Sequence, residues 1–383
     1  VLEEELAQQE RANNEAIKDE LSEAIDDAKK LRERLSDFKN ELRQKKDLEW
    51  QHKQSLEKML QDQQRIQQRL EEANKRLGEN IQKQQPEDEN VREKQEQLQK
   101  LFNEAASQEM KELMQQIQQL MSELNKEQTL KMAEQFESKS VDLEKEMERL
   151  LELFKQLEME KNLKDQISDL RKMADKQESR SEKTEGDKEL ADSLKQQQDS
   201  LSKQLDEFGK KQDSLRQKNE GLKPPRKMED RSGQQEGIQK DMKDASQELG
   251  KSSKEGKSKA AKKQKEASGK MKEMADQMEQ EMQESDQEQA EEDARMLRQL
   301  LENLVALSFD QELLMKELGR VNSQTPKYLS LVQDQFRIKE NFRIVEDTLD
   351  VLSKRVVEIQ SFVMDKVGEI GDNFRDGLKH LEE

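Results

Sequence analysis

Between residues 17 and 42, apolar side chains recur at alternating steps of four and three. The positions are Ile17, Leu21, Ala24, Ala28, Leu31, Leu35, Phe38 and Leu42. This heptad spacing places the side chains on one narrow stripe of a helix, which is stable in water when the stripe of another helix covers it. The chain therefore has to supply a partner for this helix, from itself or from a second molecule.

The same register becomes polar after residue 42 and then recovers. Lys45, Glu49 and His52 occupy the next stripe positions. The pattern resumes at Leu56, Met59, Gln63, Ile66, Leu70, Ala73 and Leu77. Pro86 cannot donate a backbone hydrogen bond and disfavours helix at the residue before it. We predict one long coiled-coil helix over residues 1–85, with a break in "KKDLEWQHK" as the alternative.

The composition favours helices over ordinary globular domains. Of the 383 residues, 41% are charged, 30% are hydrophobic and 3% are aromatic, which is typical of long helices and coiled coils. Disorder is the competing interpretation of so charged a chain, and the regular apolar spacing argues against it. The net charge of −18 repels nucleic acid, so no nucleic-acid partner is expected.

Turn and linker residues divide the middle of the chain. We predict helical hairpin segments over residues 86–219, with a turn at Gly186 and a helix that begins with Ser140 as its N-cap. One Gly and two adjacent Pro mark a Pro/Gly linker over residues 220–227.

Residues 228–284 form a low-complexity charged segment that we predict to be helical or partly disordered, with 250–270 the most disorder-like part. Residues 251–272 contain nine Lys and two Glu, whereas 273–293 contain ten acidic residues and no basic one. No Arg or aromatic ring accompanies the Lys block, so ion pairing within the chain is favoured over nucleic-acid binding. A stripe with helical spacing predicts packing rather than promiscuous binding: Met271, Met274, Met278 and Met282.

Apolar and aromatic residues concentrate near the C-terminus, where we predict a compact helical bundle over residues 285–383. Its first helix is expected to start at a capping box that begins with Ser285 and to stop at Gly319. The next helix should begin with Thr325 as N-cap and Pro326 at the first helical position.

The stretch "NLVALSFDQELLMKEL", Asn303 to Leu318, carries apolar residues on several sides of its helix. A helix that is apolar nearly all round is buried on more than one flank. We therefore predict that it is the central helix of the bundle, wrapped by 326–353 and 355–383. The candidates for packing or docking are Leu304, Leu307, Phe309, Leu314, Phe336, Phe342 and Phe362.

No arrangement of residues predicts a catalytic site, a cofactor site or a metal site. The chain has no Cys, and no potential metal ligands lie near His52 in the sequence. His380 lies near the last carbonyls of the final predicted helix, where a partial positive charge is tolerated, and no catalytic role is expected of it. "GKSK" at Gly256 lacks the earlier Gly of a phosphate-binding loop. We interpret His52 as a polar residue in the apolar stripe that sets the register or marks a bend.

Four stretches resemble a family of large Bacteroidota envelope proteins that share a domain of unknown function: "KKDLEWQHK", "LLELFKQLE", "NLVALSFDQELLMKEL" and "TLDVLSKRVVEIQSFV". The resemblance implies N-terminal transmembrane helices, an immunoglobulin-like region and a Gln/Glu/Lys-rich helical region outside the cytoplasm. This chain would be the helical region only, on the periplasmic side of the inner membrane. It would be membrane-anchored through segments that it does not contain. No site residue follows from the resemblance.

These observations predict an all-α protein of elongated antiparallel coiled-coil hairpins with a compact C-terminal bundle. The leading hypothesis is a non-enzymatic scaffold that spaces or docks other proteins of the cell envelope. The alternative is a coiled-coil arm of a larger ATP-driven machine whose catalytic heads lie outside this sequence. Homo-oligomers are compatible with both, because a heptad stripe does not specify whose helix covers it.

Overall fold

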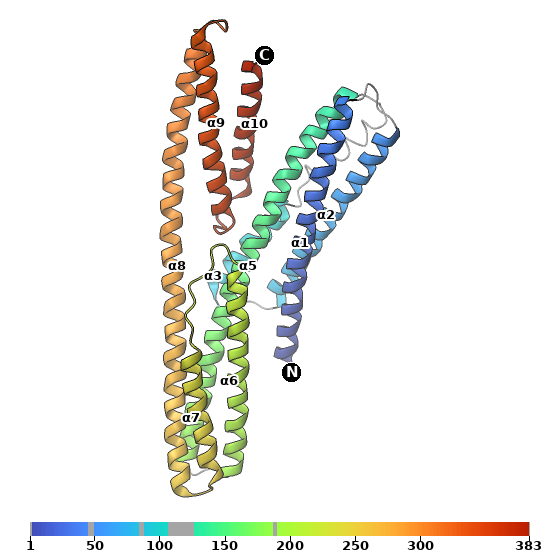
Figure 1. The fold of residues 1–383 in the computed structure, drawn as a ribbon. Helices are drawn as coiled ribbons and strands as arrows, with labels where there is room; N and C mark the ends of the chain where they lie inside the picture. Colours follow the sequence, from blue (N-terminus) through green and yellow to red (C-terminus); the bar gives the residue numbers. More distant parts are fainter. Residues whose placement is uncertain (1, 45–49, 84–87, 106–125, 187–189, 383) are drawn as a thin grey trace. The chain divides into compact units, whose positions relative to one another are not determined.

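The computed structural model describes residues 2–44, 50–83, 88–105, 126–186 and 190–382. Within these ranges every regular element is an α-helix and no strand occurs (Figure 1). The predicted all-α fold class is therefore confirmed.

The chain divides into two compact units. The first contains Val1–Leu157 and Asp293–Glu383, and the second contains Glu158–Glu292. Two long helices, α5 (Lys126–Glu185) and α8 (Lys254–Leu318), contribute residues to both units.

In the first unit, the predicted single helix over residues 1–85 is wrong. The structure has α1 (Leu2–Gln44) and α2 (Trp50–Lys83), and these two helices pack against each other. The alternative prediction, a break in "KKDLEWQHK", agrees with the end of α1 at Gln44 and the start of α2 at Trp50. Residues 45–49 and the predicted stop at Pro86 lie outside the described residues.

Helices α1 and α2 run antiparallel, and their apolar stripes cover each other. The Asn13 side chain, early in α1, donates a hydrogen bond of 2.8 Å to Asn80 Oδ1, late in α2. All predicted stripe residues from Ile17 to Leu42 and from Leu56 to Leu77 are buried. Folding back therefore gives each stripe the partner that a straight helix would lack.

His52 is buried in the first turn of α2, where the apolar stripe of this helix begins. Its ring meets the edge of Phe38 at a centroid distance of 6.0 Å, and its Nε2 lies 4.0 Å from a carboxylate oxygen of Glu41. The interpretation of His52 as a polar member of the apolar stripe is confirmed.

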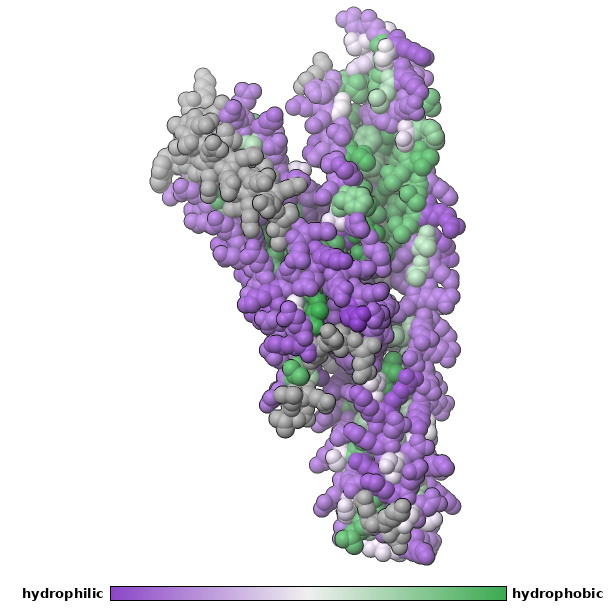
Figure 2. Space-filling model, turned by 180° about the vertical axis from the view of Figure 1, so that it is seen from behind, coloured by the Kyte–Doolittle hydropathy of each residue, from purple (hydrophilic) through white to green (hydrophobic). Residues whose placement is uncertain are grey.

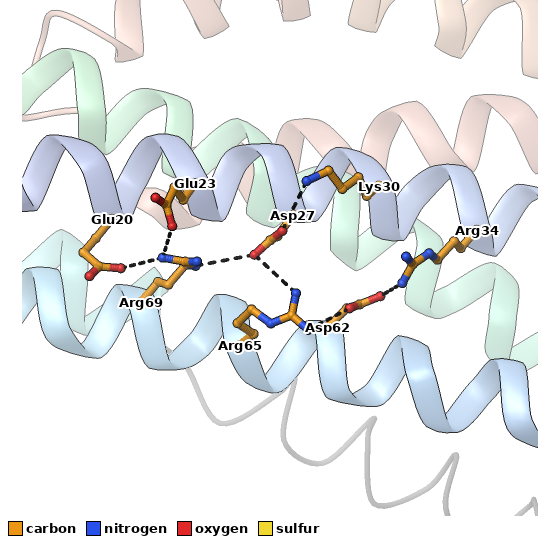
Figure 3. A network of polar contacts seen from close by, with 8 residues as sticks. All are labelled: Glu20, Glu23, Asp27, Lys30, Arg34, Asp62, Arg65 and Arg69. Atoms are coloured by element: carbon orange, nitrogen blue, oxygen red, sulfur yellow. Dashed lines mark hydrogen bonds and ion pairs between the residues drawn. The ribbon is translucent and has the colours of Figure 1, made fainter.

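A ladder of ion pairs runs along one edge of the α1–α2 hairpin (Figure 3). Arg69 on α2 contacts Glu20 at 2.9 Å and Asp27 at 3.4 Å, both on α1. Arg65 contacts Asp62 at 3.4 Å, one turn away on its own helix. These side chains range from the half-exposed Arg65 to the largely buried Asp27 and Asp62. Because Arg69 on α2 pairs with two carboxylates on α1, the ladder favours one register of the hairpin.

Helix α3 (Glu89–Ala105) and the first half of α5 share one apolar core with α1 and α2. Helix α5 runs antiparallel to α1, because Arg43 pairs with Glu134 at 3.0 Å and Arg32 pairs with Glu144 at 2.9 Å. The α1–α2 hairpin is therefore covered by further helices of the same chain.

Two predicted helix starts are wrong. Ser140 is a buried residue within α5, and Ser285 lies within α8, well after its first residue Lys254. A local capping signal contributes only about 1 kcal/mol. Apolar burial on both sides of each signal continues the helix through it.

Other helix boundaries agree with the sequence. Helix α8 stops immediately before Gly319, and α9 (Pro326–Ser353) begins directly after Thr325. The Thr325 hydroxyl makes no cap bond to the new helix and instead donates to the Asn322 carbonyl at 2.8 Å. Helix α10 (Ser361–Glu382) follows after a short turn.

The second unit is a four-helix bundle of α6 (Ala191–Glu220), α7 (Ser232–Gly250) and the parts of α5 and α8 that belong to it. An irregular segment over 221–231 separates α6 from α7, so the linker predicted at 220–227 starts one residue early and ends four residues early. Gly186 follows the last residue of α5. The predicted methionine packing stripe is also confirmed: Met271, Met274 and Met278 are buried, and Met282 packs partly buried.

A buried polar layer crosses this bundle. Gln198 Oε1 on α6 accepts hydrogen bonds from Gln177 on α5 at 3.1 Å and from Gln264 on α8 at 2.9 Å. A buried polar group stabilises the fold only where its partners are in place. These hydrogen bonds therefore favour one alignment of α5, α6 and α8 along the bundle axis.

The disorder predicted as an alternative within 228–284 is not observed at 250–270. Only residues 251–253 separate α7 from α8, and Ala260 and Ala267 are buried on the inner face of α8. Three lysines of the basic block pair with neighbouring helices, as the ion-pairing interpretation predicted: Lys263–Asp241 at 3.0 Å, Lys270–Asp241 at 2.5 Å and Lys272–Glu178 at 2.6 Å.

Asp241 provides a test of this arrangement. Burial alone would raise the pKa of the Asp241 carboxyl, but hydrogen bonds from Lys270 and Lys263 outweigh it and hold the pKa below its usual value. A depressed folded-state pKa contributes stability above the unfolded-state pKa, and this contribution is lost as pH falls through the folded-state value.

We therefore expect Asp241→Asn to lower the free energy of unfolding by about 1–2 kcal/mol at neutral pH, because the two lysines are partly exposed. The difference from wild type should vanish in acid, as measured by urea unfolding across the acidic range. Asp244→Asn, on the same helix, is the matched control. An equal loss in both variants, or a loss independent of pH, would contradict the assignment.

Candidate docking surface

Helix α8 is buried on one side only at its C-terminal end. Leu300 and Leu314 are buried against α9 and α10, whereas Leu301, Val305 and Phe309 are 64%, 54% and 61% exposed. The prediction of a central helix wrapped on several flanks is therefore wrong. The apolar spacing predicts which residues share a helix face, but it does not reveal whether a second apolar face is covered.

The seven sequence-predicted residues divide between core and surface. Leu314 and Phe342 are buried, and Leu304 and Leu307 pack partly buried against the same core. The three remaining aromatic rings are exposed over much of their area: Phe309, Phe336 and Phe362. The first group holds the bundle together, and the second is available for docking.

Helix α9 carries an exposed apolar stripe of its own. Its members recur at steps of seven or eight, which keeps them on one face of the helix: Leu329, Phe336, Ile344 and Val351. Of these four residues only Phe336 was a predicted docking candidate, although the regular spacing was a usable signal for the others. Helix α10 adds Phe362 and Ile370. Figure 2 shows apolar side chains gathered toward the upper right of its view, where these helices lie.

A packed interior holds the exposed residues in place. The Phe342 ring on α9 meets Phe374 on α10 at a centroid distance of 5.3 Å. The side-chain amides of Gln311 on α8 and Gln335 on α9 donate to each other at 2.9 Å. The exposed stripes are thus displayed on helices whose opposite faces are fixed.

Arg149 on α5 forms hydrogen bonds with the backbone of the turn between α9 and α10. The buried guanidinium donates to the Ser353 carbonyl at 2.9 Å and also to the Ile359 carbonyl. Glu146 lies 3.3 Å from Arg149 and accepts a hydrogen bond of 3.3 Å from the Ser361 hydroxyl. Arg149 could not be identified from the sequence, because one Arg on a charged helix carries no distinguishing signal.

Burial raises the pKa of the Glu146 carboxyl, and the positive charge of Arg149 offsets part of this effect. The pair and its hydrogen bonds act on the backbone of the turn. They therefore position the start of α10 and its exposed Phe362.

A cavity of about 370 Å³ opens beside this turn. Burial also raises the pKa of Asp142, which lines the cavity, while Lys139 and Lys145 oppose the rise. The charged groups of its lining are engaged in structural pairs: Lys145 contacts Glu346 on α9 at 3.0 Å, and Glu146 contacts Arg149.

Within the described part of the chain, no group of three or more His, Asp or Glu side chains could hold a metal ion. In the same ranges, no helix combines the length and the apolar character that membrane crossing requires.

Comparisons of the chain with protein-family models, curated proteins and solved structures give no match. The candidate surface is therefore defined by its own residues.

The two faces of α9 differ in burial and should respond differently to truncation. Ile338→Ala removes a side chain that is 4% exposed, and we expect it to lower the free energy of unfolding by about 2–5 kcal/mol. Ile344→Ala removes the same groups from a position that is 61% exposed, so its effect should stay within about 0.5 kcal/mol. Chemical denaturation of the two purified variants checks this, and similar losses would show that Ile344 is covered.

Proposed function

We propose that this chain is a non-enzymatic structural region of a cell-envelope protein, which spaces partner proteins and docks them through the exposed face of α8, α9 and α10. The observation that carries the proposal is the set of large apolar side chains displayed there. Large contiguous apolar patches are rare on the surfaces of monomeric soluble proteins, and those that occur commonly mark interaction sites.

The surroundings of this surface favour a protein partner. Charged residues of both signs border the apolar side chains: Glu312 and Lys316 on α8, and Arg337 on α9. An apolar centre with a polar rim is the usual anatomy of a protein–protein interface. Aromatic rings such as Phe309 and Phe362 are suited to act as anchors in it.

The packing of α1 on α2 supports the spacing role. Two long helices whose apolar stripes cover each other resist bending better than either helix alone. Antiparallel coiled-coil hairpins of this kind would hold attached partners at a set separation.

The compartment in this proposal rests on the resemblance to Bacteroidota envelope proteins and places the chain on the periplasmic side of the inner membrane. The alternative role, as an arm of an ATP-driven machine, stays a hypothesis that no described residue favours.

The docking function can be tested by photocrosslinking in cells that make the full-length protein. A benzophenone amino acid replaces Ile344 or Phe362, both exposed on the apolar surface, and Gln61 on α2 serves as an exposed control. We expect protein adducts of defined mass from the first two positions and not from Gln61. Adducts with lipid alone, or equal labelling at all three positions, would contradict protein docking.

A further inference from the structure

The exposed face of α8 has a symmetric sequence pattern centred on Val305. Helical geometry places the following exposed residues on this face, at steps of four, three, four, four, three and four: Ala294, Arg298, Leu301, Val305, Phe309, Glu312 and Lys316. The series of steps reads the same in both directions. It spans about 33 Å of helix at 1.5 Å per residue.

The side-chain chemistry follows the same symmetry. In an antiparallel pair of identical helices centred on Val305, each residue lies opposite its mirror position. Leu301 then meets Phe309 of the other copy, and the two Val305 side chains meet at the centre. Arg298 meets Glu312 of the other copy, and this complementary contact occurs twice. A two-fold interface requires such self-complementarity.

We propose that the occupant of this face is a second copy of the same chain, bound through α8 in antiparallel orientation. This inference rests on the proposed docking function and names the partner for one part of the surface. The apolar centre would supply the burial, and the two Arg298–Glu312 contacts would fix the direction and register of the pair.

Parallel pairing of the same face is disfavoured by its charges. Each residue would then lie opposite itself, so that Arg298 would face Arg298 and Glu312 would face Glu312. Like charges across an interface oppose association, whereas the antiparallel arrangement removes both repulsions.

Helix α9 provides an internal comparison. Its exposed stripe has the same steps of four and three, at Leu329, Gln333, Phe336, Glu340, Ile344, Asp347 and Val351. The centre of that series is Glu340, so self-pairing would bring two carboxylates together. The charge pattern therefore selects α8 for self-association and leaves α9 available to a different protein.

The first test measures the molar mass of the purified 383-residue chain by size-exclusion chromatography with light scattering over a range of concentrations. We expect a dimer that dissociates on dilution. Val305→Glu should give a monomer with unchanged helical circular dichroism, because it places two carboxylates at the two-fold axis. Ile344→Glu, at a similarly exposed position of α9, should leave the dimer intact.

The second test exchanges the charges. Arg298→Glu and Glu312→Arg should each weaken dimerisation about tenfold or more, since each change creates two like-charge contacts. The double variant should restore wild-type dimerisation, because the pairs re-form with their signs reversed. Only an antiparallel contact between these two positions predicts that rescue.

A monomeric wild type at all concentrations, a dimer that survives Val305→Glu, or a double variant as weak as the singles would overturn the inference. Photocrosslinking from Ile344 or Phe362 to another protein would still occur in that case, and the proposed docking function would stand. Loss of those adducts with an intact α8 dimer would instead remove the docking function and keep the dimer.

Discussion

The structure depends on the covering of narrow apolar stripes in a chain whose surface is otherwise charged. The chain has 3% aromatic and 41% charged residues, so no single helix can bury its own apolar stripe, and each stripe needs the stripe of a neighbour. Helix α2 covers α1, α7 covers α6, and the long helices α5 and α8 complete the core of each unit. Polar contacts such as the Gln198 layer then choose among the alignments that apolar burial permits.

Sequence reasoning identified which residues are apolar and regularly spaced, and these residues are buried from Ile17 to Leu42. The sequence does not reveal which helix covers these residues, since a heptad stripe requires an apolar partner but does not determine which helix supplies it. The same limit explains the error at α8. Leu314 and Phe309 are equally apolar, yet one is buried and the other is exposed, because the packing of α9 and α10 decides which face is covered.

Local end signals were reliable only where burial did not compete with them. Gly319 and Pro326 delimit their helices because the chain leaves the core between them. Ser140 and Ser285 lie inside long helices whose packing continues past them. The role of Arg149 could not have been predicted, because the two carbonyl groups that accept its hydrogen bonds lie more than 200 residues away in the sequence.

The most direct test of this account is whether α1 is covered by α2 of the same chain. The sequence contains no Cys, so Asn13→Cys and Asn80→Cys can be introduced together without interference. The native side chains hydrogen-bond at 2.8 Å, and a short thiol crosslinker applied to dilute protein should therefore link the two positions within one chain. Denaturing electrophoresis and mass spectrometry should show a crosslinked species of single-chain mass. Links formed only between chains would show that another molecule covers α1 and would contradict the folded-back hairpin.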